Sequence, residues 1–498
     1  MTLSLTPQQS WDPLPPGEWN QAAARHLLRR AGWSAVPAEV VRATQEGLPA
    51  TLERLFPVRP VLLPEPEEIA QDEERSLALR QQAALAAPEE KRTLQRQIRE
   101  HSQEALLGLT VKWLQFAADP ANAAYQKWVL FLSDIYVVSF EKVPRAPLIY
   151  RHFDLLARYG LGPAPALAKA VSRSPAMILY LDLNQNRPEA PNENFARELF
   201  ELFLLGEGNY SERDIKESAR AFTGYRLGRE GREFVFAPRQ HDNGPKTIFG
   251  QTGNFTGDGV IDLAYGTRAA GAFLPHELVK FYLSDTMLPP AYLDALGERW
   301  RGQGYELRWL AHRFFGSRLF FAPEFRAAFI KSPLQYYLGL MQDLELDVPP
   351  APRLVVGPLR QMGQVLFRPP NVRGWLGGRT WINSGSLAAR RSLAESLLAP
   401  LNERALNQDE LVAVAAARAA GRDNFRVTDE RLGPLLSAGP DGAAGLLCAA
   451  LLAAPPTPAT LADLRDYLAG AGPGEAEARR RTRRALSAVL AASEYQLC

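Results

Sequence analysis

Apolar residues recur three or four positions apart through most of the chain, the spacing that lines one side of an α-helix. A first helix is predicted from Glu18, and Gly32 should end it in a left-handed C-terminal cap. A second is predicted over residues 37–47, and further apolar helices over residues 124–176 and 260–346. In the 124–176 stretch, the side chains expected in the core are Trp128, Phe131, Ile135 and Tyr136.

Alternating apolar residues interrupt this helical pattern once. Short β-type runs at residues 225–227, 234–236 and 247–249 are separated by glycine-containing turns. The pattern predicts a mainly α, multi-helical fold with a small β-hairpin or meander insertion around residues 225–250.

Composition changes divide the chain into four predicted parts. Residues 66–105 are rich in charge, Gln and Ala and are broken at Pro88, which favours an exposed helical hairpin arm. The last part is rich in Ala, Leu and Arg and is interrupted at Gly439 and Gly472. The predicted parts are N-terminal helices (1–65), the arm (66–105), a central helical domain (106–400) with the β insertion (225–255) and a Trp/Gly-rich loop (367–385), and C-terminal helices (401–498).

The charge balance is close to neutral. The 498 residues contain 57 Lys and Arg against 55 Asp and Glu, a formal net charge of +2, so nothing favours nucleic acid as a partner. Two cysteines, Cys448 and Cys498, suggest neither a disulfide framework nor a zinc motif. No apolar stretch is long enough to span a membrane, and no export segment is evident. We therefore expect a soluble, cytoplasmic protein, with its oligomeric state open.

The stretch "PNENFARELFELFLLGEGNYSERD" concentrates charged side chains on one helix face. On a regular helix, the residues that share this polar face are Glu193, Asn194, Arg197, Glu198 and Glu201. The opposite, apolar face has Phe195, Leu199, Leu202 and Phe203. One hypothesis is a solvated face stabilised by ion pairs four residues apart. The other is a catalytic surface, with Arg197 keeping one of Glu198 and Glu201 ionised.

Polar residues flank this helix on both sides. Asn192 and Asn194 follow Pro191 and are candidates either for helix capping or for ligand binding. Ser211 and Asp214 match a capping box for the next helix.

The segment "HDNGPKTIFG" offers a second group of chemistry-bearing residues. His241 beside Asp242 could act as a base with an orienting carboxylate, and Lys246 could stabilise developing negative charge. The alternative is a turn formed by Asp242 and Asn243 with a surface histidine. A catalytic role requires this group to share a pocket with the acidic helix.

Two further patterns have weaker chemical content. "NFTGDGVIDLAY" resembles a calcium loop but has Tyr265 where a bidentate Glu is needed, so Asp258 is more simply a helix N-cap. We assign no metal ligand and no cofactor. Trp375 and Trp381, followed by Asn383, could form a binding platform for a sugar or peptide, or could fill a gap between helices.

Several long strings together resemble the domain of unknown function 1800 family of bacterial proteins. They include "HLLRRAGW", "NENFARELFELFLLGEGNYSERDIKESARAFTGY", "HDNGPKTIFG" and "RPPNVRGWLGGRTWINSGSLAAR" and run in family order from about residue 22 to the end. The resemblance implies a mainly helical protein, often encoded beside a secreted, sulfatase-like companion. It also implies two histidines where this chain has Ser133 and Ile135.

Two functional hypotheses remain open. The first is a non-catalytic accessory protein that acts with the sulfatase-like companion in export or an envelope-polymer process; the two missing histidines favour it slightly. The second is a hydrolase or transferase for a polar polymer, using Arg197, Glu198 and Glu201 with His241, Asp242 and Lys246.

Overall fold

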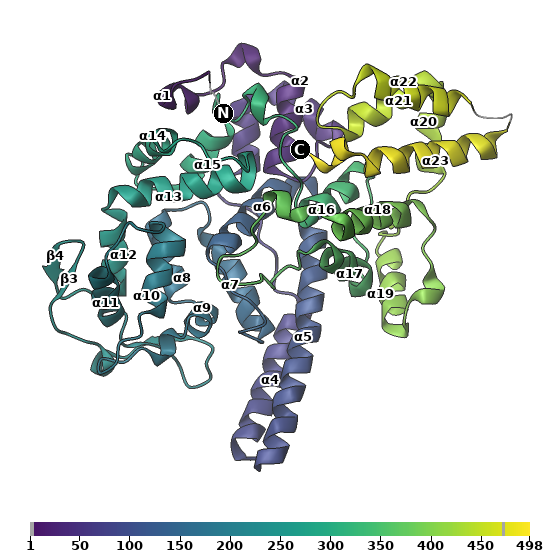
Figure 1. Ribbon diagram of the computed structural model, residues 1–498. Helices are drawn as coiled ribbons and strands as arrows, with labels where there is room; N and C mark the ends of the chain where they lie inside the picture. The colour runs from purple at the N-terminus through teal and green to yellow at the C-terminus, as the bar shows by residue number, and fades with distance from the viewer. Residues whose placement is uncertain (1–3, 471–473) are drawn as a thin grey trace.

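The computed structural model describes residues 4–470 and 474–498, so the predicted break at Gly472 lies outside the described residues. Within them, the chain forms 23 α-helices and two small antiparallel sheets of two strands each, and the β3–β4 sheet (residues 246–253) lies at the edge of the molecule (Figure 1). The prediction of a mainly α fold with a small β insertion is confirmed. The four-part domain division stays a prediction.

The α-helices follow one another along the whole chain. The first eight are α1 (Pro7–Ser10), α2 (Gln21–Ala31), α3 (Pro37–Leu55), α4 (Glu67–Leu85), α5 (Pro88–Ala118), α6 (Pro120–Ile135), α7 (Ala146–Tyr159) and α8 (Ala164–Ser172). The next eight are α9 (Pro175–Tyr180), α10 (Asn194–Glu198), α11 (Glu212–Ala221), α12 (Gly257–Tyr265), α13 (Arg268–Leu278), α14 (Pro290–Arg301), α15 (Leu307–Phe315) and α16 (Pro333–Asp343). The last seven are α17 (Pro352–Met362), α18 (Ser384–Leu398), α19 (Gln408–Ala419), α20 (Gly433–Ser437), α21 (Gly439–Leu451), α22 (Pro458–Ala469) and α23 (Glu475–Ala491). Two π-helical segments extend α10 and α13, namely η3 (Leu199–Leu204) and η5 (Val279–Leu283).

Glycines shape the two N-terminal helices differently from the prediction. Helix α2 ends at Ala31, but Gly32 has φ −106°, so the predicted left-handed cap is wrong. Gly32 is instead a close-packing position, because a Cβ there would lie 3.0 Å from the Leu28 carbonyl oxygen and 3.5 Å from Ala123. Gly47, predicted to end the second helix, interrupts it instead: its φ of 82° kinks α3, which continues to Leu55, so the predicted range of 37–47 is too short.

Helices α4 and α5 form an antiparallel pair that projects from the body of the protein (Figure 1). They meet across Pro88, which begins α5. Asp72 on α4 is buried and accepts hydrogen bonds from Ser76 (2.9 Å) and from Ser102 on α5 (2.8 Å). This pairing fixes one helix against the other at the base of the arm.

The β insertion consists of two separate hairpins. Strands β1 (Tyr225–Leu227) and β2 (Phe234–Phe236) pair with each other at the predicted positions. β3 (Lys246–Ile248) pairs with β4 (Gln251–Gly253), a strand that the sequence pattern did not indicate. The third predicted run therefore belongs to a second sheet, and β3 packs on α11.

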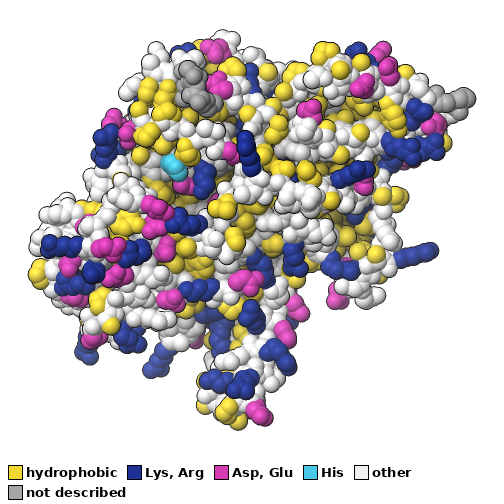
Figure 2. All heavy atoms as spheres, in the orientation of Figure 1, with side chains coloured by type: hydrophobic (Ala, Val, Ile, Leu, Met, Phe, Trp, Pro, Cys, Tyr) yellow, Lys and Arg dark blue, Asp and Glu magenta, His cyan; other side chains and the backbone are white. Residues whose placement is uncertain are grey.

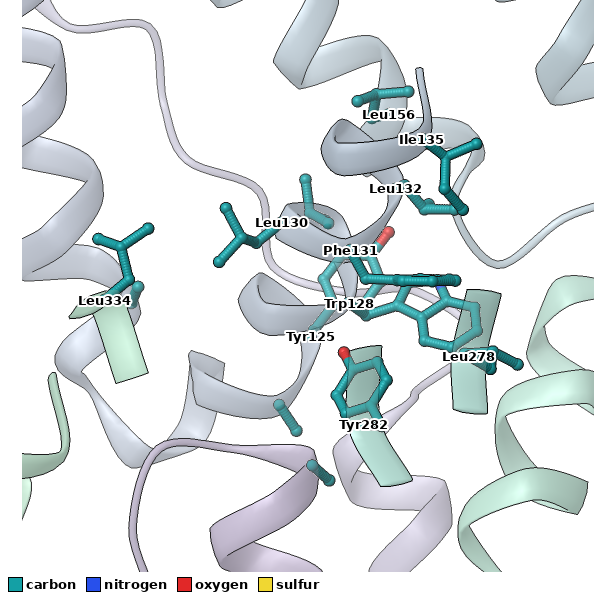
Figure 3. Close-up of a cluster of buried hydrophobic side chains, with 14 of the residues drawn as sticks. Tyr125, Trp128, Leu130, Phe131, Leu132, Ile135, Leu156, Leu278, Tyr282 and Leu334 are labelled. Atoms are coloured by element: carbon teal, nitrogen blue, oxygen red, sulfur yellow. The ribbon is translucent and has the colours of Figure 1, made fainter. Parts of the chain in front are cut away.

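Helix α6 runs through the main hydrophobic core. Trp128, Phe131, Ile135 and Tyr136 are all at most 5% exposed, as predicted. Trp128 Nε1 donates to the Gly160 carbonyl (2.7 Å), and Phe131 packs against Tyr282 of η5 (Figure 3). These contacts fix α6 against η5 and thereby position polar residues at the C-terminal end of α6.

The surface mixes both signs of charge. Lys and Arg are interspersed with Asp and Glu on the face in Figure 2, as the nearly neutral composition suggests. On α23, ion pairs four residues apart join Glu475 to Arg479 (2.5 Å) and Glu477 to Arg481 (3.0 Å).

None of the helices described is by itself long and apolar enough to cross a bilayer, although a bent pair, Glu430–Ser437 with Gly439–Leu451, passes by length and composition.

Candidate functional site

A cleft of about 670 Å³ lies where five segments of the chain meet. Its walls come from the C-terminal end of α6, the segment η3 with the loop after it, the α13–η5 helix, the first turns of α14, and the loop before Gly378. A cavity of about 50 Å³ lies directly behind it, because the two spaces share Asp134, Ile135, Glu277, Lys280 and Leu376 as lining. This shared wall concentrates titratable groups between a polar opening and an apolar interior.

Asp134, in the last turn of α6, is the most perturbed carboxyl group in this wall. Burial, with a smaller contribution from neighbouring Glu277, raises its pKa to about 7 against the lowering effects of the Trp375 N–H and Lys280. Its Oδ1 accepts the Trp375 backbone N–H at 2.9 Å. A carboxyl group with a pKa near 7 can both donate and accept a proton at neutral pH.

The loop over Asp134 needs glycine at residue 374. Gly374 has φ 71°, a conformation that favours glycine, and a Cβ there would lie 2.1 Å from Asp134 Oδ1. The backbone of the loop can therefore lie directly against the carboxyl group and present the Trp375 N–H to it.

Glu277, at the end of α13, has the opposite electrostatic environment. Burial alone would raise its pKa, but the hydrogen bond from His276 and the charge of Lys280 outweigh burial and lower it. His276 Nδ1 lies 2.9 Å from Glu277 Oε1, and Lys280 Nζ lies 3.5 Å from Oε2. Glu277 is thus held as a carboxylate beside an Asp134 that binds its proton tightly.

The outer part of the cleft contains a network around Arg373. Its Nη2 donates to Glu201 Oε1 (2.7 Å) and to Glu207 Oε1 (2.8 Å). Glu201 Oε2 also accepts the Tyr210 hydroxyl at 2.8 Å. The acidic helix therefore contributes Glu201 to the cleft, with Arg373 as its cationic partner. Ion pairing leaves this region polar with little net charge.

Both π-helical segments of the described chain form part of this cleft. Glu201 and Leu202 lie on η3, and Lys280 lies on η5. π-Helical turns are rare and concentrate at functional sites. In η3 the wider turn changes which side chains share a face. Leu202, predicted on the apolar face, is only partly buried and lines the cleft beside Glu201.

Arg197 lies outside the cleft. It does not pair with Glu201, although regular helical spacing favours that pair. Its guanidinium donates to both Glu212 oxygens (2.8 Å each) and to Glu193 (3.2 Å). The predicted Glu193–Arg197 pair is therefore present, but the partner of Glu201 is Arg373. Burial and nearby Glu201 raise the pKa of Glu198, so its carboxyl group differs electrostatically from that of the ion-paired Glu201.

The three candidate asparagines make local backbone contacts. Asn192 Oδ1 accepts the Asn194 N–H (3.0 Å), and Asn194 Nδ2 donates to the Leu181 carbonyl (3.1 Å). Asn383 caps α18 in a capping box with Ser386, and the predicted box of Ser211 with Asp214 is also formed. Asn383 thus acts as a helix cap, whereas the N-cap of α10 is Glu193 without a side-chain cap bond, so the predicted capping by Asn192 and Asn194 is wrong. Their binding roles stay predictions.

Trp375 and Trp381 are each 8% exposed and line the small inner cavity. Their burial favours the interpretation that they fill space between helices. Their binding role remains a prediction, since both border the cavity behind Asp134.

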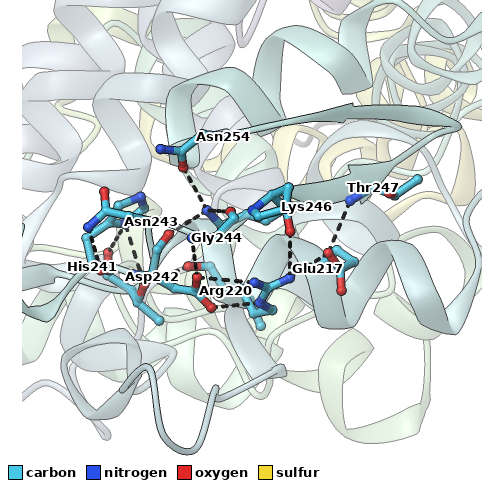
Figure 4. Close-up of polar contacts among 12 residues, drawn as sticks. Glu217, Arg220, His241, Asp242, Asn243, Gly244, Lys246, Thr247 and Asn254 are labelled. Atoms are coloured by element: carbon cyan, nitrogen blue, oxygen red, sulfur yellow. Dashed lines mark hydrogen bonds and ion pairs between the residues drawn. The ribbon is translucent and has the colours of Figure 1, made fainter.

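The group around His241 lies between α11 and the second hairpin (Figure 4). His241 is 8% exposed, and its Nδ1 donates to the Thr223 carbonyl (2.9 Å). Asp242 forms the predicted turn by accepting the Gly244 N–H (2.8 Å) and is bound by two Arg220 nitrogens (2.7 and 3.1 Å). Arg220 and the Gly244 N–H lower the pKa of Asp242 against the effect of burial.

Lys246 is fully buried in the same group. Its Nζ donates to the carbonyls of Asp242 (2.5 Å) and Gly244 (3.1 Å) and to Asn254 Oδ1 (3.2 Å). Three acceptors match the three N–H groups of an ammonium, so this arrangement ties the loop to the hairpin.

The structure does not bring the two predicted groups into one cleft. Glu201 lines the cleft, whereas the lining contains none of His241, Asp242 and Lys246. The reason is that the hairpin group is held against α11 by Arg220. The catalytic roles of its three residues stay predictions.

Replacing Arg220 should loosen this hairpin. We expect Arg220→Met to lower the free energy of unfolding by about 1–3 kcal/mol, because the partly buried Asp242 loses its charged partner. Chemical denaturation measures this change. Arg391→Met is the matched control: its pair with Glu395 is largely exposed, and we expect less than about 0.5 kcal/mol there. Equal effects of both substitutions would contradict the anchoring role.

The calcium-like segment also differs from the prediction. The N-cap of α12 is Thr256, and Asp258 lies inside the first turn, so the predicted cap is wrong. Asp258 instead accepts hydrogen bonds from Arg173 and, at 3.2 Å, from the Tyr225 hydroxyl, which draw it toward β1. Among the residues that the structure describes, no three His, Cys, Asp or Glu side chains converge as a metal-binding group.

Sequence reasoning missed the central residues of the cleft, which are Asp134, His276, Glu277, Lys280 and Arg373. One indication was present: Asp134 stands between Ser133 and Ile135, the positions at which the family resemblance implies histidines, and Ile135 lines both spaces. A search for charge clusters would also have found "PHELVK".

Comparison with known proteins supports the resemblance. A family model described as "Protein of unknown function (DUF1800)" matches residues 26–497, nearly the whole chain. Searches of curated proteins and of solved structures found no match. The chain belongs to the DUF1800 family of proteins of unknown function.

Proposed function

We propose that the protein is a hydrolase acting on glycosidic bonds of a polar polymer, with Asp134 as proton donor and Glu277 as the ionised partner. The observation that carries the proposal is the opposite displacement of two carboxyl pKa values in one cleft. The pKa of Asp134 is raised to about 7, while the pKa of Glu277 is lowered. Carboxyl pairs with separated pKa values divide the acid and base roles between them.

In the proposed reaction, the proton of Asp134 passes to the oxygen of the leaving group as the bond between that oxygen and the sugar carbon breaks. The Glu277 carboxylate stabilises the cationic transition state or accepts a proton from the water that adds to the carbon. One bond is cleaved, one water is consumed, and proton exchange with solvent restores both carboxyl groups.

The lining supports a neutral, hydroxyl-rich substrate. Its ionised side chains pair with one another, as in Arg373 with Glu201 and Arg268 with Asp294. Paired charges can hydrogen-bond hydroxyl groups, while the apolar Leu376 (68% exposed) and partly buried Phe273 offer surface for sugar-ring faces.

Activity should have an acidic optimum. We expect kcat/KM to fall as the pH rises through about 7, because Asp134 loses its proton, and to fall at low pH as Glu277 is protonated. The measurement is reducing-end release from a panel of polysaccharides, followed by a pH profile on any substrate that is cleaved. Glu277→Gln should remove the acidic limb together with most of the activity. Cleavage that is unaffected by this substitution, or that increases above pH 8, would refute the assignment.

The accessory role beside a sulfatase-like companion stays a prediction of the family resemblance. We propose the hydrolase in preference because it is argued from two carboxyl environments in the cleft of this chain, whereas the companion rests on the resemblance alone.

A further inference from the structure

Lys127 is a buried amine that the proposed hydrolysis does not use. It lies on α6 two turns before Asp134, is 4% exposed, and lines the small cavity behind the cleft. No ion pair joins it to a carboxylate among the described residues. A buried lysine without such a partner is costly in its charged form.

The hydrogen bonds of Lys127 match a neutral amine. Its Nζ donates to the carbonyl oxygens of Arg30 (2.8 Å) and Gly32 (3.0 Å), at the end of α2. These are its two acceptors in the described structure. A neutral amine has two N–H groups and one lone pair, whereas an ammonium has a third N–H and no lone pair. With both N–H groups engaged, the lone pair of the amine is free to react.

Burial among aromatic side chains disfavours the charged form of Lys127. Nζ lies 5.5 Å from the centre of the Trp33 ring and 5.4 Å from that of Tyr282. The ring faces attract an ammonium weakly, but the loss of water outweighs this attraction. Burial, together with the charges of Arg30 and Lys331, lowers the pKa of Lys127 to about 7 against the raising effect of Cys498. A lysine activated by desolvation and neighbouring cations is the kind that attacks carbonyl carbons in enzymes.

We propose that Lys127 is an amine nucleophile that captures a small aldehyde or ketone as an imine in the cavity behind the cleft. The lone pair of Nζ adds to the carbonyl carbon, and the carbonyl oxygen leaves as water with both amine protons. The products are one imine and one water, so no oxidant or reductant is needed. This site is independent of the proposed hydrolysis, because it uses another residue and another bond.

The cavity limits what can reach the amine. Its volume of about 50 Å³ has room for a few waters, so it admits a two- or three-carbon carbonyl compound and excludes an aromatic aldehyde. The lining shared with the larger cleft, including Asp134 and Lys280, gives the entry direction.

The test is reductive trapping on the full-length protein. Acetaldehyde and cyanoborohydride are added briefly at pH 7, and the modification rate of each lysine is measured by peptide mass spectrometry. Exposed lysines are almost wholly protonated at this pH, so we expect Lys127 to be modified at least about tenfold faster than exposed Lys91. Relative to Lys91, its advantage should shrink by about tenfold per pH unit above pH 8.

Two controls separate reactivity from access. Lys331 is also buried, with its Nζ 3.6 Å from the centre of the Tyr495 ring, but it lines neither the cavity nor the cleft and should remain unmodified. Benzaldehyde should modify Lys91 but not Lys127. The proposal is overturned if Lys127 of the wild-type protein is modified no faster than Lys91, or only after denaturant is added. Because trapping is measured on the wild-type protein, its outcome is scored independently of whether that protein cleaves any polysaccharide.

Discussion

Asp134→Asn is expected to lower kcat/KM by about 10²- to 10⁴-fold, the usual contribution of a general acid. The substitution keeps the size of the side chain and an oxygen that can accept the Trp375 N–H, now 2.9 Å from Asp134 Oδ1. It removes only the transferable proton. The measurement is cleavage of whichever polysaccharide the wild-type protein hydrolyses.

The same variant should be more stable than the wild type at alkaline pH. Burial raises the pKa of Asp134 from 3.8 to about 7, so folding favours its protonated form. That contribution is complete below pH 3.8 and is lost as the pH rises through about 7. Asparagine stays neutral, so its advantage grows across this window. At about 1.4 kcal/mol per pH unit, the stability advantage of Asp134→Asn reaches at most about 4 kcal/mol at pH 8. Because the Asp134 side chain is partly exposed, the advantage is smaller than this limit.

Denaturant titrations of both proteins at pH 4 and pH 8 measure this change. Asp441→Asn is the control, because the Asp441 side chain is 88% exposed. Its stability should follow that of the wild type at both pH values. A variant that loses activity and also unfolds more easily at pH 8 would show that Asp134 is a structural carboxylate instead.

Gly374→Ala should disrupt the cleft from the other side. The added methyl would stand 2.1 Å from Asp134 Oδ1 and 2.9 Å from the Asp134 carbonyl oxygen, on a backbone with φ 71°. We expect a loss of about 2–4 kcal/mol in unfolding free energy, because overpacking adds to the strain of a positive φ. Thermal and chemical denaturation measure it.

Gly363→Ala measures the stability cost of backbone strain without overpacking. Gly363 has φ 95°, but a Cβ there would meet nothing within 4 Å. This control should cost about 1 kcal/mol through backbone strain alone. If both glycine variants lose the same stability, the loop does not press on Asp134, and the proposed positioning of the carboxyl group by the Trp375 N–H fails.

Local structure could be predicted from the sequence wherever one segment determines it. The residues of β1 and β2, the position of the interruption at Gly47 and the Ser211 capping box follow from turn and capping chemistry within a few positions. Strand β4 was missed because "QTG" has no apolar alternation and depends on pairing with β3.

The cleft could not be predicted in the same way. Asp134 and Glu277 are brought together only by the packing of α6 against η5, through contacts such as Phe131 with Tyr282. The partner of Glu201 is Arg373, which is distant in sequence, while the regular helical spacing pointed to Arg197. A helical wheel at 100° per residue also fails across η3, where the turn is wider.

The π-helix η3 makes the acidic wall sensitive to chain length. Each π-turn contains one residue more than an α-turn, so removing a single codon between residues 202 and 204 would let ordinary α-helical bonding resume. Residues on one side of the deletion would then rotate by about 100° about the helix axis relative to residues on the other side. Glu201 and Tyr210 would no longer face each other. A loss of three nucleotides could thus redesign this pocket more thoroughly than most point substitutions.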